Sequence, residues 1–161
     1  MSTLLRFIYI WLLKLALKRD IMNAKIKQAI ESAVKNESLA KTFKIELVEL
    51  ETGMSAVEMI YDPGMMGNIY KRAHGGAIYA LIDEAFETAG QTHGTIAVAL
   101  NVSVTYIASP TDGSRLRAEA CEVSRTKRTA VYDINVFGPN REHIATCQAL
   151  AFRTGKPIPF L

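Results

Sequence analysis

Hydrophobic and polar positions follow two different periods along residues 22–161, and the changes of period divide this part of the chain into elements. In residues 24–39, apolar side chains recur every three or four positions between lysines and glutamates, which predicts a surface helix. Phe43, Ile45 and Leu47 alternate with polar residues instead, which predicts a strand over residues 43–51. Residues 54–61 predict a second strand, and Gly53 between the two predicts a hairpin. A loop is expected to follow and to run to His74.

A second helical period lies in the middle of the chain. Residues 76–91 place apolar side chains on one face of a helix, which Gly90 and Gly94 are expected to help end. Four strand-like runs follow, at residues 96–108, 115–126, 129–137 and 143–152. This order predicts an α+β fold in which an antiparallel sheet of about six strands packs on one central helix, with an extra N-terminal helix.

Residues 1–21 differ from the rest of the chain in composition. Residues 4–17 are apolar except for Arg6 and Lys14, and they contain Trp11, the single tryptophan. Fourteen helical residues reach about 21 Å, short of a hydrocarbon core of about 30 Å, so a spanning helix is not expected. Three interpretations stay open: an upstream extension of a chain that begins at Met22, an amphipathic helix that contacts a membrane surface, and a targeting segment.

The distribution of charge excludes one large class of partners. The 161 residues have a net charge of +3, from 19 basic and 16 acidic residues. Residues 1–21 carry four of these basic groups and one of the acidic groups, so residues 22–161 form a neutral domain. Nucleic-acid binding needs concentrated cations that replace phosphate counterions, and is therefore not expected.

The cysteines and histidines give no sign of a metal site. Cys121 and Cys147 both lie in apolar runs and are expected to be buried thiols. The three histidines are scattered, and none has a partner at metal-ligand spacing, so no metal is expected. No convincing signal cleavage site follows the apolar N-terminal stretch, and a cytoplasmic location is the expectation.

The candidate chemistry lies around the start of the central helix. Gly75 and Gly76 allow a ligand to approach the backbone closely, and free N–H groups at a helix start stabilise negative charge. Two turns later, Asp83 lies beside the apolar face, where partial desolvation raises a carboxyl pKa. Oxyanion donors with a nearby carboxylate suit acyl transfer. The same spacing also fits an ordinary amphipathic helix with solvated acids, so the pattern alone leaves both interpretations open.

A family resemblance adds to this pattern. Asn68, the His74-Gly75-Gly76 run and the segment 81–85 that contains Asp83 together resemble the signature of hotdog-fold acyl-CoA thioesterases, in particular the phenylacetate-degradation (PaaI-type) subgroup. The similarity covers residues 25–155. It implies a sheet wrapped around the central helix, and active sites at the interface of a homodimer that commonly pairs into a homotetramer. It also implies hydrolysis of an acyl-CoA without a cofactor, since coenzyme A enters as part of the substrate.

The resemblance also implies roles for individual residues. Asp83 would be the general base or the nucleophile, and the backbone N–H of Gly75 would be the oxyanion donor. Asn68, from the protomer opposite to that of Asp83, would orient water or substrate. His74 would shape the loop. Independently of the resemblance, Gly76 is a candidate substrate contact, because a glycine at the helix start allows a ligand to approach the backbone closely.

Five other residues are candidate substrate contacts. Glu84 is an alternative carboxylate, because a glutamate serves in a related subgroup, and Ala99 stands where some relatives carry Ser or Thr opposite the acid. Arg125, Lys127 and Arg128 form the cationic cluster of the neutral domain and can meet the phosphates of coenzyme A. A solvated hairpin tip explains that cluster equally well.

Two alternative functions stay open at this point. A hotdog enoyl-CoA hydratase or dehydratase would use a histidine with a carboxylate, and His74 with Glu84 can mimic that pair. A non-catalytic acyl-CoA sensor or scaffold fits the absence of a hydroxyl at Ala99 and the apolar N-terminal segment.

Overall fold

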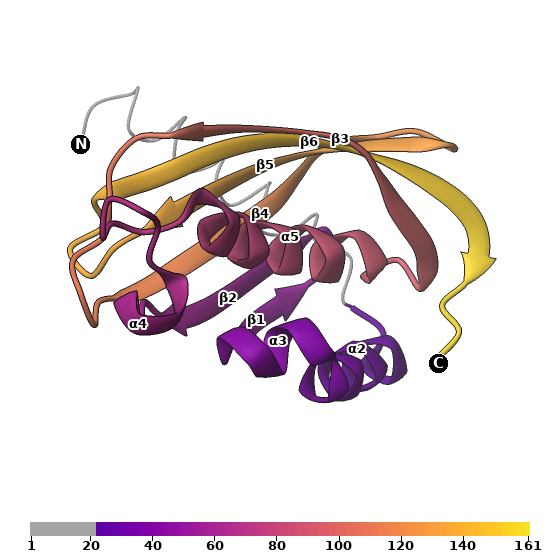
Figure 1. The fold of residues 1–161 in the computed structure, drawn as a ribbon. Coiled ribbons are helices and arrows are strands. Elements are labelled where there is room, and N and C mark those ends of the chain that lie inside the picture. The colour runs from indigo at the N-terminus through magenta and orange to yellow at the C-terminus, as the bar shows by residue number, and fades with distance from the viewer. Residues whose placement is uncertain (1–21) are drawn as a thin grey trace, which may run out of the picture.

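A computed structural model describes residues 22–161, which form one curved sheet around a long helix (Figure 1). The three interpretations of residues 1–21, including a membrane contact through residues 4–17, concern a segment outside the described residues. The elements in chain order are α2 (Ala24–Asn36), α3 (Ser38–Phe43), β1 (Glu46–Glu51), β2 (Met54–Ile60), α4 (Pro63–Met66), α5 (Gly75–Gln91), β3 (Thr95–Tyr106), β4 (Arg115–Arg125), β5 (Thr129–Phe137) and β6 (His143–Pro157).

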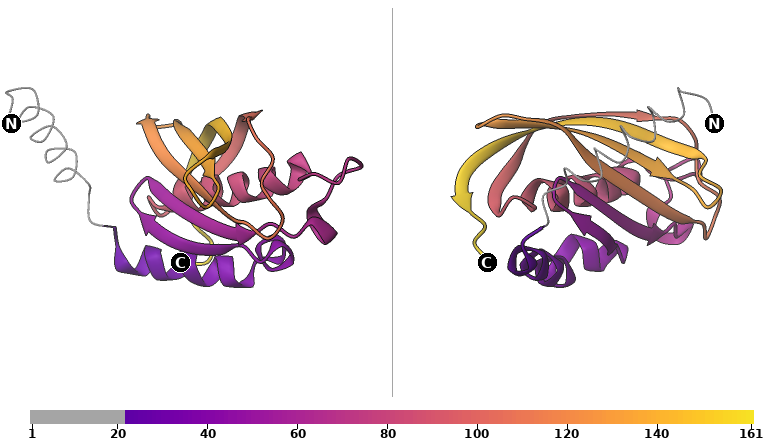
Figure 2. Two further views of the ribbon diagram at one scale, coloured as in Figure 1. Left: turned by 90° about the vertical axis from the view of Figure 1, so that its left-hand side faces the viewer. Right: turned by 180° about the vertical axis from the view of Figure 1, so that it is seen from behind.

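The sheet has six antiparallel strands in the order β1-β2-β4-β5-β6-β3, which confirms the predicted α+β class and strand number. The strands curl over α5, while α2 and α3 lie on the other side of that helix, below β1 (Figures 1 and 2). Strands β1 and β3 form the two edges of the sheet. None of the helices in residues 22–161 is long and apolar enough to cross a membrane.

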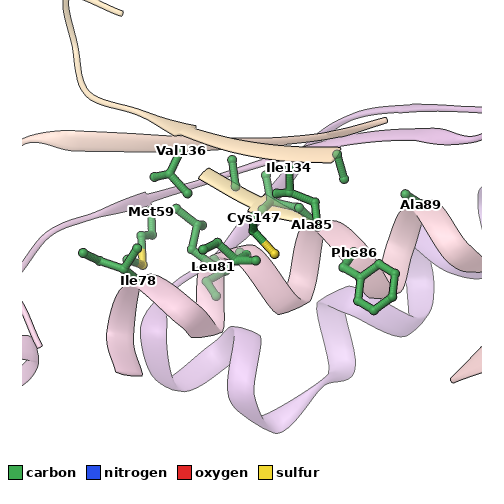
Figure 3. Packing of buried hydrophobic residues seen from close by; sticks show 14 of the residues in the cluster. Met59, Ile78, Leu81, Ala85, Phe86, Ala89, Ile134, Val136 and Cys147 are labelled. Carbon is green, nitrogen blue, oxygen red and sulfur yellow. The ribbon is translucent and has the colours of Figure 1, made fainter. Parts of the chain in front are cut away.

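The core fills the space between α5 and the sheet. Leu81 and Ala85 on α5 are fully buried and lie against Ile134 of β5 and Cys147 of β6 (Figure 3). This face is the apolar stripe that the helical period predicts. Cys147 is buried as expected, but Cys121 on β4 is exposed, because strand residues alternate between the two faces of the sheet and Cys121 falls on the outer one.

The segment before β1 differs from the prediction. The expected helix over residues 24–39 is two helices, which are separated at Glu37 by an extended backbone (φ −68°, ψ 136°). Phe43, expected to begin a strand, ends α3, and Lys44 adopts a left-handed conformation with φ 53°. Ile45 is buried although it precedes the strand. The apolar residues that suggested one strand therefore belong to the end of a helix, a tight turn and the start of β1.

Three further boundaries also differ. The expected loop before α5 contains the short helix α4, which Asp62 caps by accepting the N–H of Gly64 at 2.9 Å. Gly90 does not end α5 but lies buried inside it, where its missing side chain lets the helix approach Ala97 of β3. Strand β6 continues five residues past the predicted end at residue 152 and contains Gly155 with φ 74°.

Candidate functional site

The N-terminus of α5 presents one free backbone donor. The His74 side chain caps the helix, because its Nδ1 accepts the N–H of Gly76 at 3.0 Å. The N–H groups of Ala77 and Ile78 both donate to the carbonyl of His74. Within the described residues the N–H of Gly75 donates no hydrogen bond, so it is the group left to meet a ligand at the positive end of the helix dipole.

Tyr106 at the end of β3 fixes this helix start. Its hydroxyl donates to the carbonyl of Gly75 at 3.0 Å. A Cβ atom at position 75 would lie 3.1 Å from the tyrosine ring and hydroxyl, so a glycine is needed at this position. Sequence reasoning assigned Tyr106 no role, since a contact between residues 31 positions apart leaves no local signal.

The Asn68 side chain holds the loop in front of the helix. Its Oδ1 accepts the N–H groups of Tyr70 (2.8 Å) and Arg72 (3.1 Å), and its Nδ2 donates to the carbonyl of Ala73 (3.3 Å). Both lone pairs of Oδ1 are therefore used, and one of the two Nδ2 hydrogens is left for another partner. These loop contacts are sufficient to account for an asparagine at position 68. The remaining Nδ2 hydrogen is also free to donate to a substrate.

Asp83 lies eight residues after Gly75 on α5 and lines a cavity of about 220 Å³. Ala99 of β3 lines the same cavity, so the structure brings these two predicted residues together. Burial and, to a smaller extent, the Glu37 carboxylate raise the pKa of Asp83 above its ordinary value. A half-buried carboxylate with a raised pKa is a better proton acceptor than a fully solvated one.

Glu84 faces elsewhere. It is 2% exposed, both of its carboxylate oxygens are inaccessible to solvent, the Glu37 side chain acts on it, and it lines a separate cavity beside α2. Successive helical residues point about 100° apart, which places neighbouring side chains on different sides of α5. Glu84 and the exposed cap His74 therefore form no pair, and the hydratase interpretation loses the histidine–carboxylate pair that it needs.

Comparison with known proteins agrees with this geometry. The family model described as "Thioesterase superfamily" matches residues 70–145. The "Putative esterase" of Archaeoglobus fulgidus is 32% identical over 140 residues, which cover 84% of this chain and 90% of that protein. The chain belongs to the thioesterase superfamily.

Solved structures place this thioesterase in the PaaI type. The structure of the Escherichia coli PaaI protein from the phenylacetic acid degradation operon matches with a TM-score of 0.80 and 27% identity, over 85% of this chain and 99% of that one. A Streptococcus mutans protein bound to acetyl CoA matches with a TM-score of 0.67 and 28% identity, over 71% of this chain and 91% of that one. The predicted family and the hotdog arrangement are confirmed.

The cationic cluster of the thioesterase divides into two parts. Arg125 forms an ion pair with Glu122 (Nε to Oε1, 3.2 Å), and its Nη1 lies 3.1 Å from Nδ1 of His93. Lys127 and Arg128 lie exposed at the β4–β5 turn, and neither side chain forms an ion pair within residues 22–161. The structure thus leaves two of the three predicted cations free to meet an anion.

Proposed function

We propose that this thioesterase hydrolyses an acyl-CoA thioester to the free acid and coenzyme A. The observation that carries the proposal is the unpaired N–H of Gly75 at the start of α5, on the same helix as the half-buried Asp83. Support also comes from the Escherichia coli relative, which is named an acyl-coenzyme A thioesterase and is 28% identical over 137 residues.

The chemistry follows from the charge that develops on the thioester. In the general-base route, Asp83 takes a proton from water while the water oxygen bonds to the thioester carbonyl carbon. The N–H of Gly75 donates to the resulting oxyanion, which the helix dipole also stabilises. The C–S bond then breaks, and the thiolate of coenzyme A receives the proton held by Asp83. In the nucleophile route, Asp83 forms a mixed anhydride that water cleaves.

Two protomers are needed to assemble this site. Gly75 and Asp83 are eight residues apart on one helix, which is about 12 Å along its axis. Both groups must come within about 3 Å of atoms at the same reacting centre. We therefore infer that Asp83 of one protomer works with Gly75 and Asn68 of a second copy, in a homodimer or in a tetramer made of two such dimers.

Lys127 and Arg128 are the proposed contacts for the phosphates of coenzyme A. Both are exposed and free of ion pairs in residues 22–161, whereas the charge of Arg125 is already matched by Glu122. Free cations at a turn can adapt to phosphate oxygens with little reorganisation. Gly76, whose N–H is held by His74, supports the turn beneath the thioester and adds no oxyanion donor.

The decisive test is Asp83→Asn, measured by thiol release over aryl-, short- and medium-chain CoA esters. Loss of the general base or nucleophile should lower kcat by about 10²–10⁴-fold. Thermal stability and CoA binding should be retained, because the substitution keeps the side-chain shape.

A matched control is Asp133→Asn, which makes the same change at an exposed position of β5 and should leave turnover unchanged. Undiminished turnover in Asp83→Asn would refute the assignment of Asp83. CoA-ester binding by the wild type with no thiol release on any ester would instead support the acyl-CoA sensor.

A further inference from the structure

The cavity that Asp83 lines has an exposed mouth and a buried floor. Its volume is about 220 Å³, and it lies where β3 leaves the C-terminal end of α5 (Figure 2). The exposed residues Glu87, Val98 and Ala99 form the mouth. Asp83, which is half-buried, lines the same cavity. A thioester that reacts with Asp83 therefore has its carbonyl carbon near the mouth, and its acyl chain can extend inwards.

The floor of the cavity is apolar and closed. It is formed by the buried residues Phe86, Gly90 and Ala151. A Cβ atom at Gly90 would lie 3.3 Å from the Cβ of Ala97, so α5 and β3 are already in contact there. The Gln91 side chain joins the same two elements, because its Nε2 donates to the Ala97 carbonyl and its Oε1 accepts the Ala97 N–H, both at 3.4 Å. An acyl chain that enters from the mouth thus meets a closed end.

Phe86 is the one floor residue whose side chain has atoms beyond Cβ. Its ring packs edge-on against Tyr132, with 5.3 Å between the ring centroids and 65° between the ring planes. Tyr132 is fully buried, and its hydroxyl donates to Oε2 of Glu122 at 3.0 Å. The Phe86 ring is therefore supported by a hydrogen-bonded side chain and cannot easily move aside for a longer acyl chain.

The size and charge of the cavity restrict the acyl group. An apolar cavity of about 150 Å³ holds one benzene molecule, so a cavity of about 220 Å³ holds roughly six to eight carbon atoms. The carboxylates of Asp83 and Glu87 both line the cavity, and no lysine or arginine of residues 22–161 does. A second carboxylate at the far end of an acyl chain would meet like charges and an apolar floor. The acyl group that fits is short and uncharged.

We propose that this cavity holds the acyl chain of the substrate, and that Phe86 limits the chain to an uncharged group of up to about eight carbons. The proposal rests on the proposed function for one point, the position of the thioester carbon beside Asp83. Phe86 is a specificity-determining residue in this arrangement, because it contacts the far end of the acyl chain and not the reacting atoms.

Isothermal titration calorimetry with S-alkyl-CoA thioethers, from S-ethyl-CoA to S-decyl-CoA, tests the size limit on the full chain. Thioethers carry the alkyl chain and are not hydrolysed, so binding is measured without turnover. In the wild type, affinity should rise about fourfold with each methylene that is buried and level off near eight carbons. Phe86→Leu deepens the cavity and should move this levelling point outward by about two carbons.

Phe137→Leu is the matched control for Phe86→Leu. It makes the same change at a buried position of β5 outside the cavity, and should leave the chain-length profile unchanged. Ala99→Val changes the cavity in the opposite direction, since it narrows the mouth. It should weaken binding of S-hexyl-CoA by about tenfold and leave binding of S-ethyl-CoA unaltered.

The charge of the acyl group is tested with S-(5-carboxypentyl)-CoA, in which the same six-carbon chain ends in a carboxylate. It should bind at least about tenfold more weakly than S-hexyl-CoA. Equal binding of these two thioethers would overturn the preference for an uncharged chain.

Two results would overturn the role of Phe86. One is a levelling point that is the same in the wild type and in Phe86→Leu, and the other is affinity that is independent of chain length in the wild type. Failure of the proposed function has a different signature. If the thioethers give the expected profile and no CoA ester releases thiol, the acyl cavity is supported and hydrolysis is refuted.

Discussion

Asp83 and Glu84 are neighbours in the sequence, but the helix points them into different cavities and gives them different chemistry. Asp83 is half-buried and reachable from the cavity that it shares with Ala99. Glu84 is enclosed between α5 and α2 and retains its proton at neutral pH. Glu84 is therefore cut off from a substrate in that cavity, and this difference supports the proposal that Asp83 is the general base or nucleophile.

Glu84 makes the fold less stable as the pH rises. In the unfolded chain its carboxyl group has the ordinary pKa of 4.5, whereas burial and then the Glu37 carboxylate raise the pKa to about 8 in the folded chain. Between these values the folded state binds more protons than the unfolded state, so the free energy of unfolding falls as the pH increases. Glu84→Gln should remove this slope and exceed the wild type at pH 9 by on the order of 3 kcal/mol.

Urea unfolding at pH 5, 7 and 9 measures this effect. The two proteins should differ little at pH 5, where Glu84 is protonated in the folded state, and should diverge above pH 7. Parallel stability curves for the wild type and Glu84→Gln would show that the folded protein accommodates the charge at no cost.

At the residue scale, the sequence predicted which residues lie at the site better than it predicted which other residues contact them. The spacing of Gly75 and Asp83 on one helix is local, and the structure has both on α5 where the period places them. The environment of Glu84 depends on α2, about 50 residues earlier in the chain. Helical periodicity predicts the angle between the Asp83 and Glu84 side chains, but it does not predict which other element packs against each of them. Tyr106 likewise reaches Gly75 only through the path of β3.

At the scale of elements, long periodic segments were predictable and transitions were not. Helix α5 and strands β4 and β5 begin and end within one residue of their expected bounds. The prediction that the strand begins at Phe43 was wrong. Phe43 and Ile45 fit an alternating pattern, but tertiary packing turns the chain between them at Lys44. The extension of β6 to residue 157 was missed because Gly155 suggests a strand end and instead lies inside the strand.

The cap of α5 belongs to this scale, because it links stability to the geometry of Gly75, the proposed oxyanion donor. His74→Ala removes the acceptor of the Gly76 N–H and should lower the free energy of unfolding by about 0.5–2 kcal/mol. Turnover should fall as well, because without the cap the first turn of α5 frays and the N–H of Gly75 is no longer held in one position. Urea unfolding and kcat report the two effects.

His74→Asn provides the matched comparison. Asparagine is a strong helix cap and should restore most of the stability and of the turnover lost in His74→Ala. If the asparagine variant is stable and still inactive, the imidazole has a role in the reaction beyond the cap.

The β4–β5 turn should control affinity for the CoA portion of the substrate. Replacing Lys127 and Arg128 together by alanine should raise KM for CoA esters by about tenfold with kcat unchanged, and 0.5 M salt should reduce the difference. Steady-state kinetics at low and high salt measure this. The exposed pair Lys25 and Lys27 on α2, changed to alanine together, controls for net charge and should leave KM unaltered.

Arg125 should behave differently from its neighbours in the turn. Its guanidinium holds the partly buried Glu122, which also accepts from His93 and Tyr132, so Arg125→Ala should lower stability rather than raise KM. A large KM effect in Arg125→Ala with native stability would instead show that this arginine meets the phosphates.

At the scale of the whole molecule, the sheet itself offers the surface for a second copy. Strand β3 pairs only with β6 among the described strands, so its other edge presents unpaired backbone groups. Val98 and Leu100 on this strand are 47% and 57% exposed, which is more apolar surface than an edge strand in contact with solvent usually presents. Pairing of two β3 edges would cover these side chains and bring a second helix α5 near the cavity of Asp83.

Mixing two inactive variants tests whether the site is shared between copies. Asp83→Asn lacks the carboxylate, and Asn68→Ala loses the loop anchor beside the Gly75 donor. If each site takes Asp83 from one protomer and Asn68 from the other, a mixed dimer contains one intact site and one doubly altered site. After co-refolding at equal amounts, half of the dimers are mixed, and activity should recover to about one quarter of the wild-type value. Light scattering on the mixture verifies the dimer, and activity that stays at the sum of the two separate variants would place the whole site within a single protomer.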